Sequence, residues 1–507
     1  MKRVPCIWAS TLTIALVAAI SGVAQDTRVV VEPVLPASCV KLIAEKSGDG
    51  EKLAETFEKT TDTTRIQKAL DGCKPGLAVE LAPGENTNAF LTGSLDLREG
   101  VTLLIDKGAT LYGSRDPKDY DSNPSADGPL LCGTMTDVSS AYVTAGNAPS
   151  GADGARRPAM GAQMRGRICK SLITVNVKNA AIMGDGVIDG RGGATIIGHD
   201  YSWWQMARAA EPKQLRYFST RLITASHADG FVLYRITLHN SPNYHVTVSN
   251  TDGFTAWAVH LLTPTVRGTD ARNTDGIDPG NSTNITIANS WIDNGDDNIA
   301  IKTGITHMSV LNNHFYDGHG MSIGSETFSG VSNLLVAGLT EDGTTSGIRI
   351  KSNAARGGLV HDLTYENICM KNVPIPIAIS PFYNNGTTEG FVDPGVLGDR
   401  IPDYKAITLR NIVSLTPGDV LIAGKDAAHT TEITLDTVTI KDIKPGQVHS
   451  QYTNAAMAHV NFDLTGTAVV VTPATLPPLK DAPGASLIAI DSKTKLAECV
   501  GAFPPMQ

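Results

Sequence analysis

The sequence predicts an all-β fold, a single right-handed parallel β-helix with a short N-terminal capping helix. Short runs of β-branched and aliphatic residues recur along most of the 507 residues. Two runs begin 23 residues apart at Phe231 and Phe254, and two others begin 26 residues apart at Met308 and Leu334. Repeats of this length, with Asn, Gly and Asp between the strands, are typical of a solenoid whose coils pair with their neighbours. The alternation of apolar and polar residues disfavours a helical solenoid.

Three segments depart from the repeat. Residues 64–73 carry Ile66 and Leu70 at i and i+4, which predicts a short amphipathic helix that covers the open end of the first coil. Residues 121–167 are rich in Gly, Ala, Ser and Asp and are expected to form a long surface loop. Roughly the last sixty residues are rich in proline. They are expected to form a tail packed along the coils, with disorder as the alternative except where Cys499 fastens it.

The first residues have the pattern of a secretory signal. Met1-Lys2-Arg3 is followed by an apolar stretch from Val4 to about Ile20 and then by small residues, the order of charged, apolar and cleavage regions in such signals. We therefore expect residues 1–24 to be removed and the mature chain to begin near Gln25. A membrane anchor is the alternative, but the apolar stretch is short and a polar chain follows it directly.

Six cysteines remain in the expected mature chain, because Cys6 lies in the signal. An even number in an oxidising compartment fits three disulfides. None of the six has the CxxC spacing of a zinc site. Pairing cysteines that follow one another in the sequence favours Cys39–Cys73 and Cys132–Cys169, which leaves Cys369–Cys499 as the third bond. Six cysteines also allow other pairings.

Charge limits the classes of partner. The net charge of −9 and the isoelectric point near 5.7 argue against a nucleic acid or an anionic membrane, since proteins that bind them carry a basic face. An acidic substrate would need local cations, and Arg349 and Lys351 stand at i and i+2, on one side of an expected strand. A guanidinium beside an ammonium suits a sugar carboxylate. An ordinary solvated strand face would give the same pattern.

Three carboxylates and a histidine occur at the spacing of the coils. Asp275 and Asp297 are 22 residues apart, and His319 follows 22 residues later. Neighbouring strands lie about 4.8 Å apart, so these side chains should stack on one face. Asp296 can enter the same cleft only if the chain bends, which Gly295 makes feasible. The alternatives are a solvated turn or a calcium site for the aspartate pair and a structural role for the histidine.

These residue types are suited to the hydrolysis of an acidic sugar polymer. Cleavage of a glycosidic bond needs a protonated carboxyl for the leaving oxygen and a carboxylate for water or for the anomeric carbon. Mutual repulsion among the three carboxylates should keep one of them protonated near neutral pH. His319, with a glycine on each side, should tune their protonation.

Four motifs, in order and approximate spacing, resemble those of the polygalacturonases of glycoside hydrolase family 28, nearest to the secreted bacterial endo-polygalacturonases. The motifs are Asn273-Thr274-Asp275, Gly295-Asp296-Asp297, Gly318-His319-Gly320 and Arg349-Ile350-Lys351. Further similar stretches extend the resemblance from the region of Cys39 to about residue 445, which is most of the mature chain. The segment 121–167 and the tail depart from the family pattern.

The resemblance implies an inverting, metal-free hydrolysis of α-1,4-galacturonan without a cofactor. It assigns Asp296 as the general acid, Asp275 and Asp297 as the residues that hold and activate the water, and His319 as the support for the acid's proton. It also implies that a second group of residues binds galacturonate or lies in the cleft: Asn273, Arg349, Lys351 and Tyr383.

The expected organisation is a signal peptide (1–24), an N-terminal cap with the first coils (25–95), a β-helix catalytic domain (96–447) and a C-terminal coil and tail (448–507). The expected partner is polygalacturonate or pectin, with no nucleic acid and no membrane after signal cleavage. We expect a monomer in the extracellular space or the periplasm.

Internal cleavage is the expected mode of action. Release of mono- or digalacturonate from chain ends is the main alternative, because the 121–167 loop could close one end of the cleft. A pectate lyase would need calcium-binding acids and a cationic base. A polysaccharide-binding β-helix without activity would not need the three aspartates and the histidine together.

Overall fold

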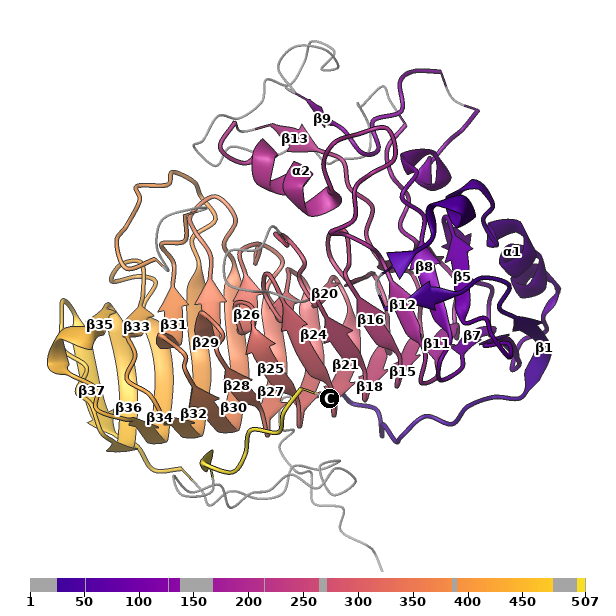
Figure 1. Cartoon of the computed structure of the whole chain (residues 1–507). Coiled ribbons are helices and arrows are strands. Elements are labelled where there is room, and N and C mark those ends of the chain that lie inside the picture. The colour runs from indigo at the N-terminus through magenta and orange to yellow at the C-terminus, as the bar shows by residue number, and fades with distance from the viewer. Residues whose placement is uncertain are drawn as a thin grey trace, which may run out of the picture.

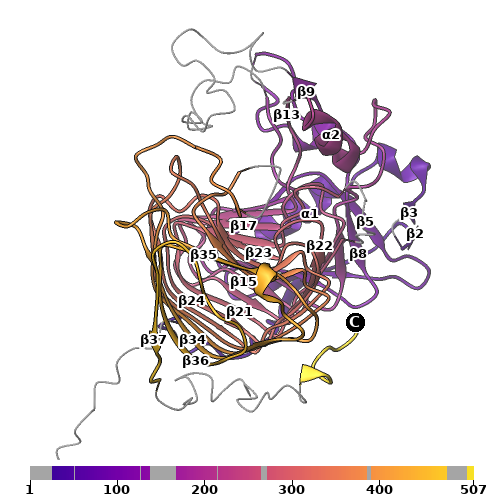
Figure 2. The ribbon, with the colours of Figure 1, turned by 90° about the vertical axis from the view of Figure 1, so that its left-hand side faces the viewer.

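The protein is a right-handed parallel β-helix, as the sequence predicts (Figure 1). The computed structural model describes residues 25–50, 52–125, 127–136, 167–213, 215–263, 271–384, 390–476 and 499–506. Figure 2 looks along the solenoid, where successive coils superpose.

One wall of the solenoid is an eleven-stranded parallel sheet, here called the site sheet. Each strand pairs with the strand one coil before it and the strand one coil after it. In chain order these strands are β6 (Leu95–Asp96), β10 (Ile173–Val175), β14 (Ile223–Ser226), β17 (Val246–Ser249), β20 (Ile277–Gly280), β23 (Ile299–Ile301), β26 (Met321–Gly324), β29 (Ser346–Lys351), β31 (Ile375–Ser380), β33 (Val420–Ala423) and β35 (Val448–Gln451).

The other walls form a 22-stranded sheet that bends around the coils. Its strands are β1 (Ser38–Ile43), β4 (Ala78–Ala82), β5 (Ala89–Thr92), β7 (Thr102–Ile105), β8 (Thr110–Gly113), β11 (Ala181–Met183), β12 (Val187–Asp189), β15 (Val232–Tyr234), β16 (Thr237–His239), β18 (Thr255–Trp257), β19 (His260–Leu262), β21 (Thr283–Ala288), β22 (Trp291–Asn294), β24 (Ile305–Leu311), β25 (His314–Asp317), β27 (Val331–Ala337), β28 (Thr340–Asp342), β30 (Leu359–Lys371), β32 (Asp403–Ser414), β34 (Thr431–Ile440), β36 (Thr453–Val460) and β37 (Val469–Pro473).

Apolar side chains stack in rows inside the coils. Ile277 pairs with Ile299, Ile299 with Met321, Met321 with Ile348, and Ile348 with Ile377. All five side chains are fully buried. Because side chains alternate along a strand, the residues between them point out of the solenoid. The site sheet therefore presents its polar residues on one outer face.

Asparagines turn the chain from one wall to the next. Asn289 and Asn312 follow β21 and β24, and each has a φ of 53°. Asparagine tolerates this left-handed conformation better than most residues. This explains why asparagine recurs between the apolar runs of the sequence.

The capping helix is confirmed as α1 (Thr63–Gly72), whose Ile66 and Leu70 are fully buried against the first coils. The described residues also include the 3-10 helices η1 (Glu55–Lys59), η2 (Pro117–Tyr120) and η3 (Pro445–Gln447). A small antiparallel pair, β2 (Gly48–Asp49) and β3 (Lys52–Leu53), lies near the same end.

The three expected disulfides are also confirmed. Their Cα–Cα distances are 5.9 Å for Cys39–Cys73, 4.8 Å for Cys132–Cys169 and 5.6 Å for Cys369–Cys499.

A lobe projects from the solenoid in both views (Figures 1 and 2). It contains α2 (Trp203–Ala210) and an antiparallel ribbon of β9 (Met135–Thr136) with β13 (Arg216–Tyr217). The sequence predicts a surface loop over residues 121–167, but β9 belongs to this ribbon, so that part of the prediction is wrong. Residues 137–166 lie outside the described residues.

Both ends of the described chain lie along the outer wall. Residues 25–37 run from β24 back to β1 (Figure 1). The backbone N–H of Asp26 donates to Ser309 Oγ at 3.0 Å, and Thr286 Oγ1 donates to Asp26 Oδ2 at 2.7 Å. At the other end, Tyr316 donates its phenol proton to the carbonyl oxygen of Pro504. The two ends therefore attach to neighbouring strands, β24 and β25.

The expected tail begins later than the sequence suggests, because β35, β36 and β37 add further coils after residue 447. Residues 477–498 lie outside the described residues, as do residues 1–24, where the signal is expected. None of the helices that the structure describes is long and apolar enough to cross a membrane.

Candidate active site

The aspartates and the histidine lie at the starts of stacked strands in the site sheet. Asp275 precedes β20, Asp296 and Asp297 precede β23, and His319 precedes β26. The N–H of Gly276 donates to the carbonyl oxygen of Asp297 at 2.9 Å, and the N–H of His319 donates to that of Asp296 at 2.8 Å. His319 Nδ1 lies 3.2 Å from Asp296 Oδ1 and 3.9 Å from Asp297 Oδ1. The structure thus brings these residues together, as their spacing predicts.

Gly295 makes the bend that lets neighbouring aspartates share one site. A Cβ at Gly295 would lie 1.9 Å from the carbonyl oxygen of Ala271, so only glycine allows the two loops to pack this closely. Thr274 Oγ1 accepts a hydrogen bond from the N–H of Gly295 at 2.9 Å. Asn294 Nδ2 donates to the carbonyl oxygens of Thr274 and Asp297 at 2.8 and 2.9 Å. The loops before β20 and β23 are therefore one hydrogen-bonded unit.

Asp297 is held between two cations. Lys351 Nζ donates to Asp297 Oδ2 at 2.8 Å, and Arg349 Nη1 donates to Oδ1 at 2.9 Å. Burial raises the pKa of Asp297, but the charges of Lys351 and then Arg349 outweigh burial and keep the pKa below its usual range. The Tyr383 ring centroid lies 5.2 Å from Lys351 Nζ and 5.9 Å from the Arg349 guanidinium carbon. The two cations predicted for substrate binding thus also keep Asp297 ionised.

Asp275 and Asp296 have pKa values displaced in opposite directions. Burial raises the pKa of Asp275 well above its usual range, and the charges of Asp296 and Asp278 add to the rise. Burial also raises the pKa of Asp296, but the charge of His319 and its hydrogen bond outweigh burial and hold that pKa well below its usual range. The surroundings therefore favour the protonated form of Asp275 and the ionised form of Asp296, which lies beside the histidine.

Sequence reasoning missed Asp278 and Lys302, which lie beside Asp275. Lys302 Nζ is 3.8 Å from Asp275 Oδ2 and 3.6 Å from Asp278 Oδ2. Asp278 is 4% exposed, and burial raises its pKa to about 7. The sequence did hold a signal for Asp278. It is a charged residue between Ile277 and Pro279 of an expected strand, at an outward position on the face that carries the site.

Replacing Asp278 by asparagine should shift the alkaline limb of the pH profile of kcat/KM to lower pH. Burial and the neighbouring carboxylates raise the pKa of Asp275, and the negative charge of Asp278 contributes to that rise. Removing this charge makes Asp275 easier to ionise, so its pKa falls. No shift of the limb, or a shift to higher pH, would contradict this expectation. Asp229→Asn, which alters an exposed partner of Lys178, is the control.

Among the described residues, one group of His, Cys, Asp and Glu side chains has the spacing of a metal site. It consists of Asp296, Asp297 and His319, with one ligand atom of each within 4.8 Å of the others. Both carboxylate oxygens of Asp297 already accept hydrogen bonds from Arg349 and Lys351. The positive charges of these two side chains oppose the binding of a metal cation, so the residues present fit acid/base chemistry better than a metal site.

Asn273 joins the site through its amide. Asn273 Nδ2 donates to Asp296 Oδ2 at 3.3 Å. Its own Oδ1 accepts a hydrogen bond from the phenol of Tyr217 at 2.8 Å. Tyr217 was missed, because it belongs to the lobe and no coil period relates it to the four motifs.

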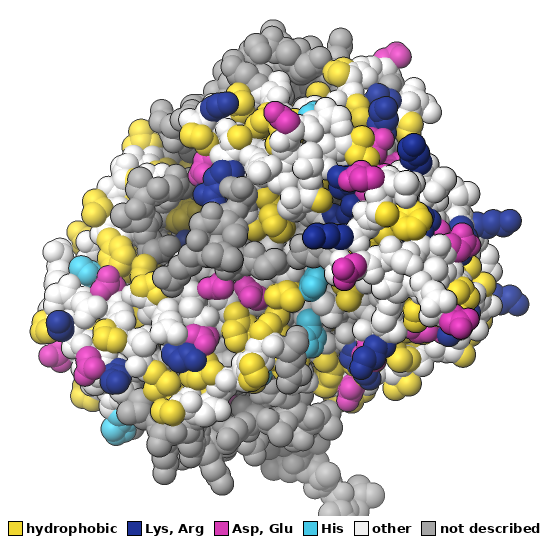
Figure 3. Space-filling view, viewed as in Figure 1, with side chains coloured by type: hydrophobic (Ala, Val, Ile, Leu, Met, Phe, Trp, Pro, Cys, Tyr) yellow, Lys and Arg dark blue, Asp and Glu magenta, His cyan; other side chains and the backbone are white. Residues whose placement is uncertain are grey.

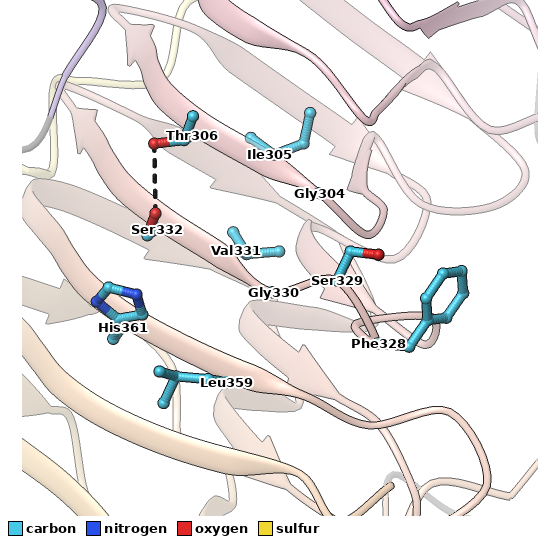
Figure 4. Close-up of a pocket in the computed structure, with 10 residues that line it drawn as sticks. All are labelled: Gly304, Ile305, Thr306, Phe328, Ser329, Gly330, Val331, Ser332, Leu359 and His361. Atoms are coloured by element: carbon cyan, nitrogen blue, oxygen red, sulfur yellow. Dashed lines mark hydrogen bonds between the residues drawn. The ribbon is translucent and has the colours of Figure 1, made fainter.

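On the face that Figure 3 shows, Lys and Arg side chains are interspersed with Asp and Glu. A separate hollow of about 430 Å³ lies where β24, β27 and β30 begin (Figure 4). Ser332 donates to Thr306 Oγ1 there at 3.3 Å, and His361 is part of its lining. None of the residues predicted for the active site lines this hollow.

Comparisons with known proteins agree with this arrangement. The sequence profile described as "Glycosyl hydrolases family 28" matches residues 157–460. An endo-polygalacturonase from Pectobacterium parmentieri is 38% identical over 434 residues, which cover 84% of this chain and 93% of that protein. An exo-poly-alpha-D-galacturonosidase from Dickeya chrysanthemi is 26% identical over 453 residues, 79% of this chain and 69% of that protein.

A solved structure shares both fold and sequence with this protein. The polygalacturonase from Erwinia carotovora ssp. carotovora superposes with a TM-score of 0.65 and 36% identity, covering 87% of this chain and all of the other. The family profile spans more than half of the chain, and the matched segment includes every residue of the site described above. The chain therefore belongs to glycosyl hydrolases family 28.

Proposed function

We propose that this protein hydrolyses the internal α-1,4-galacturonosidic bonds of polygalacturonate and pectin. The observation that carries the proposal is the contact of Asp297 with Lys351 and Arg349 beside the pair formed by His319 and Asp296. Acid/base groups for glycosidic cleavage thus meet cations suited to a sugar carboxylate. The relatives named polygalacturonase support the same substrate.

In the proposed mechanism, His319 and Asp296 together supply the proton for the leaving oxygen. Their 3.2 Å contact lets the proton pass to Asp296 as the substrate enters and expels water. Asp297, kept ionised by its two cations, takes a proton from the attacking water, and Asp275 holds that water. Attack from the face opposite the leaving group inverts the anomeric centre.

The remaining assignments extend this proposal. Asn273, Arg349, Lys351 and Tyr383 would contact galacturonate. The coils of residues 96–447 would form the catalytic domain. We further propose that the protein acts as an exported monomer, outside the cell or in the periplasm, without a metal or cofactor.

The direct test is the release of reducing sugar from polygalacturonate together with the viscosity of the solution. We expect the viscosity to fall steeply while only a few per cent of bonds are broken, because an endo enzyme cuts near the middle of long chains. Early products should be a mixture of oligomers. The higher identity to a relative named as endo-acting than to one named as exo-acting supports this mode.

The position of the lobe is the one observation that supports cleavage from chain ends. The lobe projects beside the start of the site sheet (Figure 1) and could close one end of the groove. Monomer or dimer as the first product, with nearly constant viscosity, would then replace the expected result. No release of reducing sugar, or an unsaturated product that absorbs in the ultraviolet, would contradict the proposed hydrolysis.

A further inference from the structure

Two side chains, Tyr217 and Asn273, connect the lobe to Asp296, and Asn243 of the solenoid holds the phenol. Asn243 Nδ2 donates to the phenol oxygen of Tyr217 at 3.3 Å. The phenol in turn donates to Asn273 Oδ1 at 2.8 Å, and Asn273 Nδ2 donates to Asp296 Oδ2 at 3.3 Å. The lobe thus acts on one oxygen of Asp296, Oδ2, through the side chain of Asn273.

The direction of this relay is fixed by the chemistry of its members. The phenol oxygen of Tyr217 accepts from Asn243, so its single proton is free to go to Asn273 Oδ1. This turns the NH₂ group of Asn273 toward Asp296. Burial raises the pKa of Tyr217 to about 12, so the phenol keeps its proton at the pH values at which polygalacturonate is assayed.

The lobe holds Tyr217 through backbone contacts. Tyr217 lies in β13, which pairs with β9. The ribbon continues where the N–H of Gly133 donates to the carbonyl oxygen of Phe218 at 2.8 Å and the N–H of Phe218 donates to that of Thr134 at 3.0 Å. The Cys132–Cys169 disulfide ties the start of β9 to the chain just before β10 of the solenoid. The position of the phenol is therefore set by the ribbon and the disulfide together.

The two oxygens of Asp296 have separate partners. Oδ1 accepts from the N–H of Asp297 at 2.9 Å and faces His319 Nδ1 at 3.2 Å. Oδ2 has Asn273 as its hydrogen-bond partner. Fixing both oxygens fixes the plane of the carboxyl, and hence the direction in which a proton leaves it.

We propose that Tyr217 is a positioning residue: through Asn273 it sets the carboxyl plane of Asp296 for proton transfer to the leaving oxygen. This inference rests on the proposed hydrolysis of polygalacturonate. It makes the lobe a part of the catalytic machinery, in addition to any effect on the length of the groove.

The test is Tyr217→Phe, which keeps the ring and removes the hydroxyl. We expect kcat on polygalacturonate to fall by roughly 10- to 100-fold, the scale of a small misplacement of a reacting group, with KM and the melting temperature nearly unchanged. Tyr234→Phe is the matched control, because Tyr234 lies in β15 on the outer wall, away from the ribbon, and donates its phenol proton to Glu32 Oε1 at 2.7 Å. It should retain the parent kcat.

A double-mutant cycle separates this role from a structural one. If Tyr217 acts through Asn273, Tyr217→Phe should lower kcat little further in an Asn273→Ala background. Equal kcat in Tyr217→Phe and Tyr234→Phe, or fully additive losses with Asn273→Ala, would overturn the inference while the parent remains active. An inactive parent protein would instead overturn the proposed function, and the inference with it.

Discussion

Replacing Asp296 by asparagine should lower kcat on polygalacturonate by about 10²- to 10⁴-fold, the usual contribution of general acid catalysis. Asparagine keeps the shape of the side chain and the hydrogen bond from the N–H of Asp297 to Oδ1, so the coils should remain folded. It cannot deliver a proton to the leaving oxygen. The rate of reducing-sugar release, with circular dichroism to confirm folding, checks the expectation.

A substrate with a leaving group that needs no proton identifies the step that is lost. An oligogalacturonosyl fluoride should be hydrolysed by Asp296→Asn at a rate much nearer to that of the parent than polygalacturonate is. Asp297→Asn should lose activity on both substrates, because it removes the carboxylate that activates water. Asp229→Asn should match the parent. Activity of Asp296→Asn within threefold of the parent on polygalacturonate would exclude Asp296 as the acid.

Replacing Lys351 by methionine should lower kcat/KM by about 10- to 100-fold, since a hydrogen bond to a charged group contributes roughly 1.5–3 kcal/mol. The same change should move the acid limb of the pH profile to higher pH. Asp297 must be ionised to activate water, and Lys351 is the cation that lowers its pKa most. Without that cation the pKa of Asp297 rises, so a higher pH is needed to ionise it.

The two effects of Lys351 can be measured apart. If Lys351 also binds the sugar carboxylate, Lys351→Met should lose less activity on methyl-esterified pectin than on the free polymer, and Arg349→Gln should behave similarly. Lys178→Met removes a cation from an exposed ion pair with Asp229 and should change neither limb nor rate. An unmoved acid limb in Lys351→Met would show that Lys351 does not support Asp297.

The coil period explains why so much of the site could be predicted. In a solenoid, residues one coil apart in sequence are neighbours in space, so equal intervals translate directly into contacts. The intervals that separate Asp275, Asp297 and His319 placed them at the starts of β20, β23 and β26. The disulfide between Cys132 and Cys169 could be paired from sequence because the two are consecutive cysteines, 37 residues apart.

The period says nothing about segments that leave the coils. Tyr217 reaches Asn273 from the lobe, across 56 residues of sequence. This interval spans more than two coils. Lys302 and Asp278 are 24 residues apart, close to one coil, so the period could have placed them side by side once both were recognised as residues of the site.

The sequence by itself determined the β-helix, the capping helix and the set of three aspartates with a histidine and two cations, because each follows from local patterns or from a repeated interval. Only the tertiary structure decided which carboxyl has its pKa raised and which has it lowered, that Arg349 and Lys351 bind Asp297, and that the lobe contacts Asn273. The physical reason is that pKa values depend on burial and on charges a few ångströms away. Those distances are fixed only when the coils and the lobe have folded against each other.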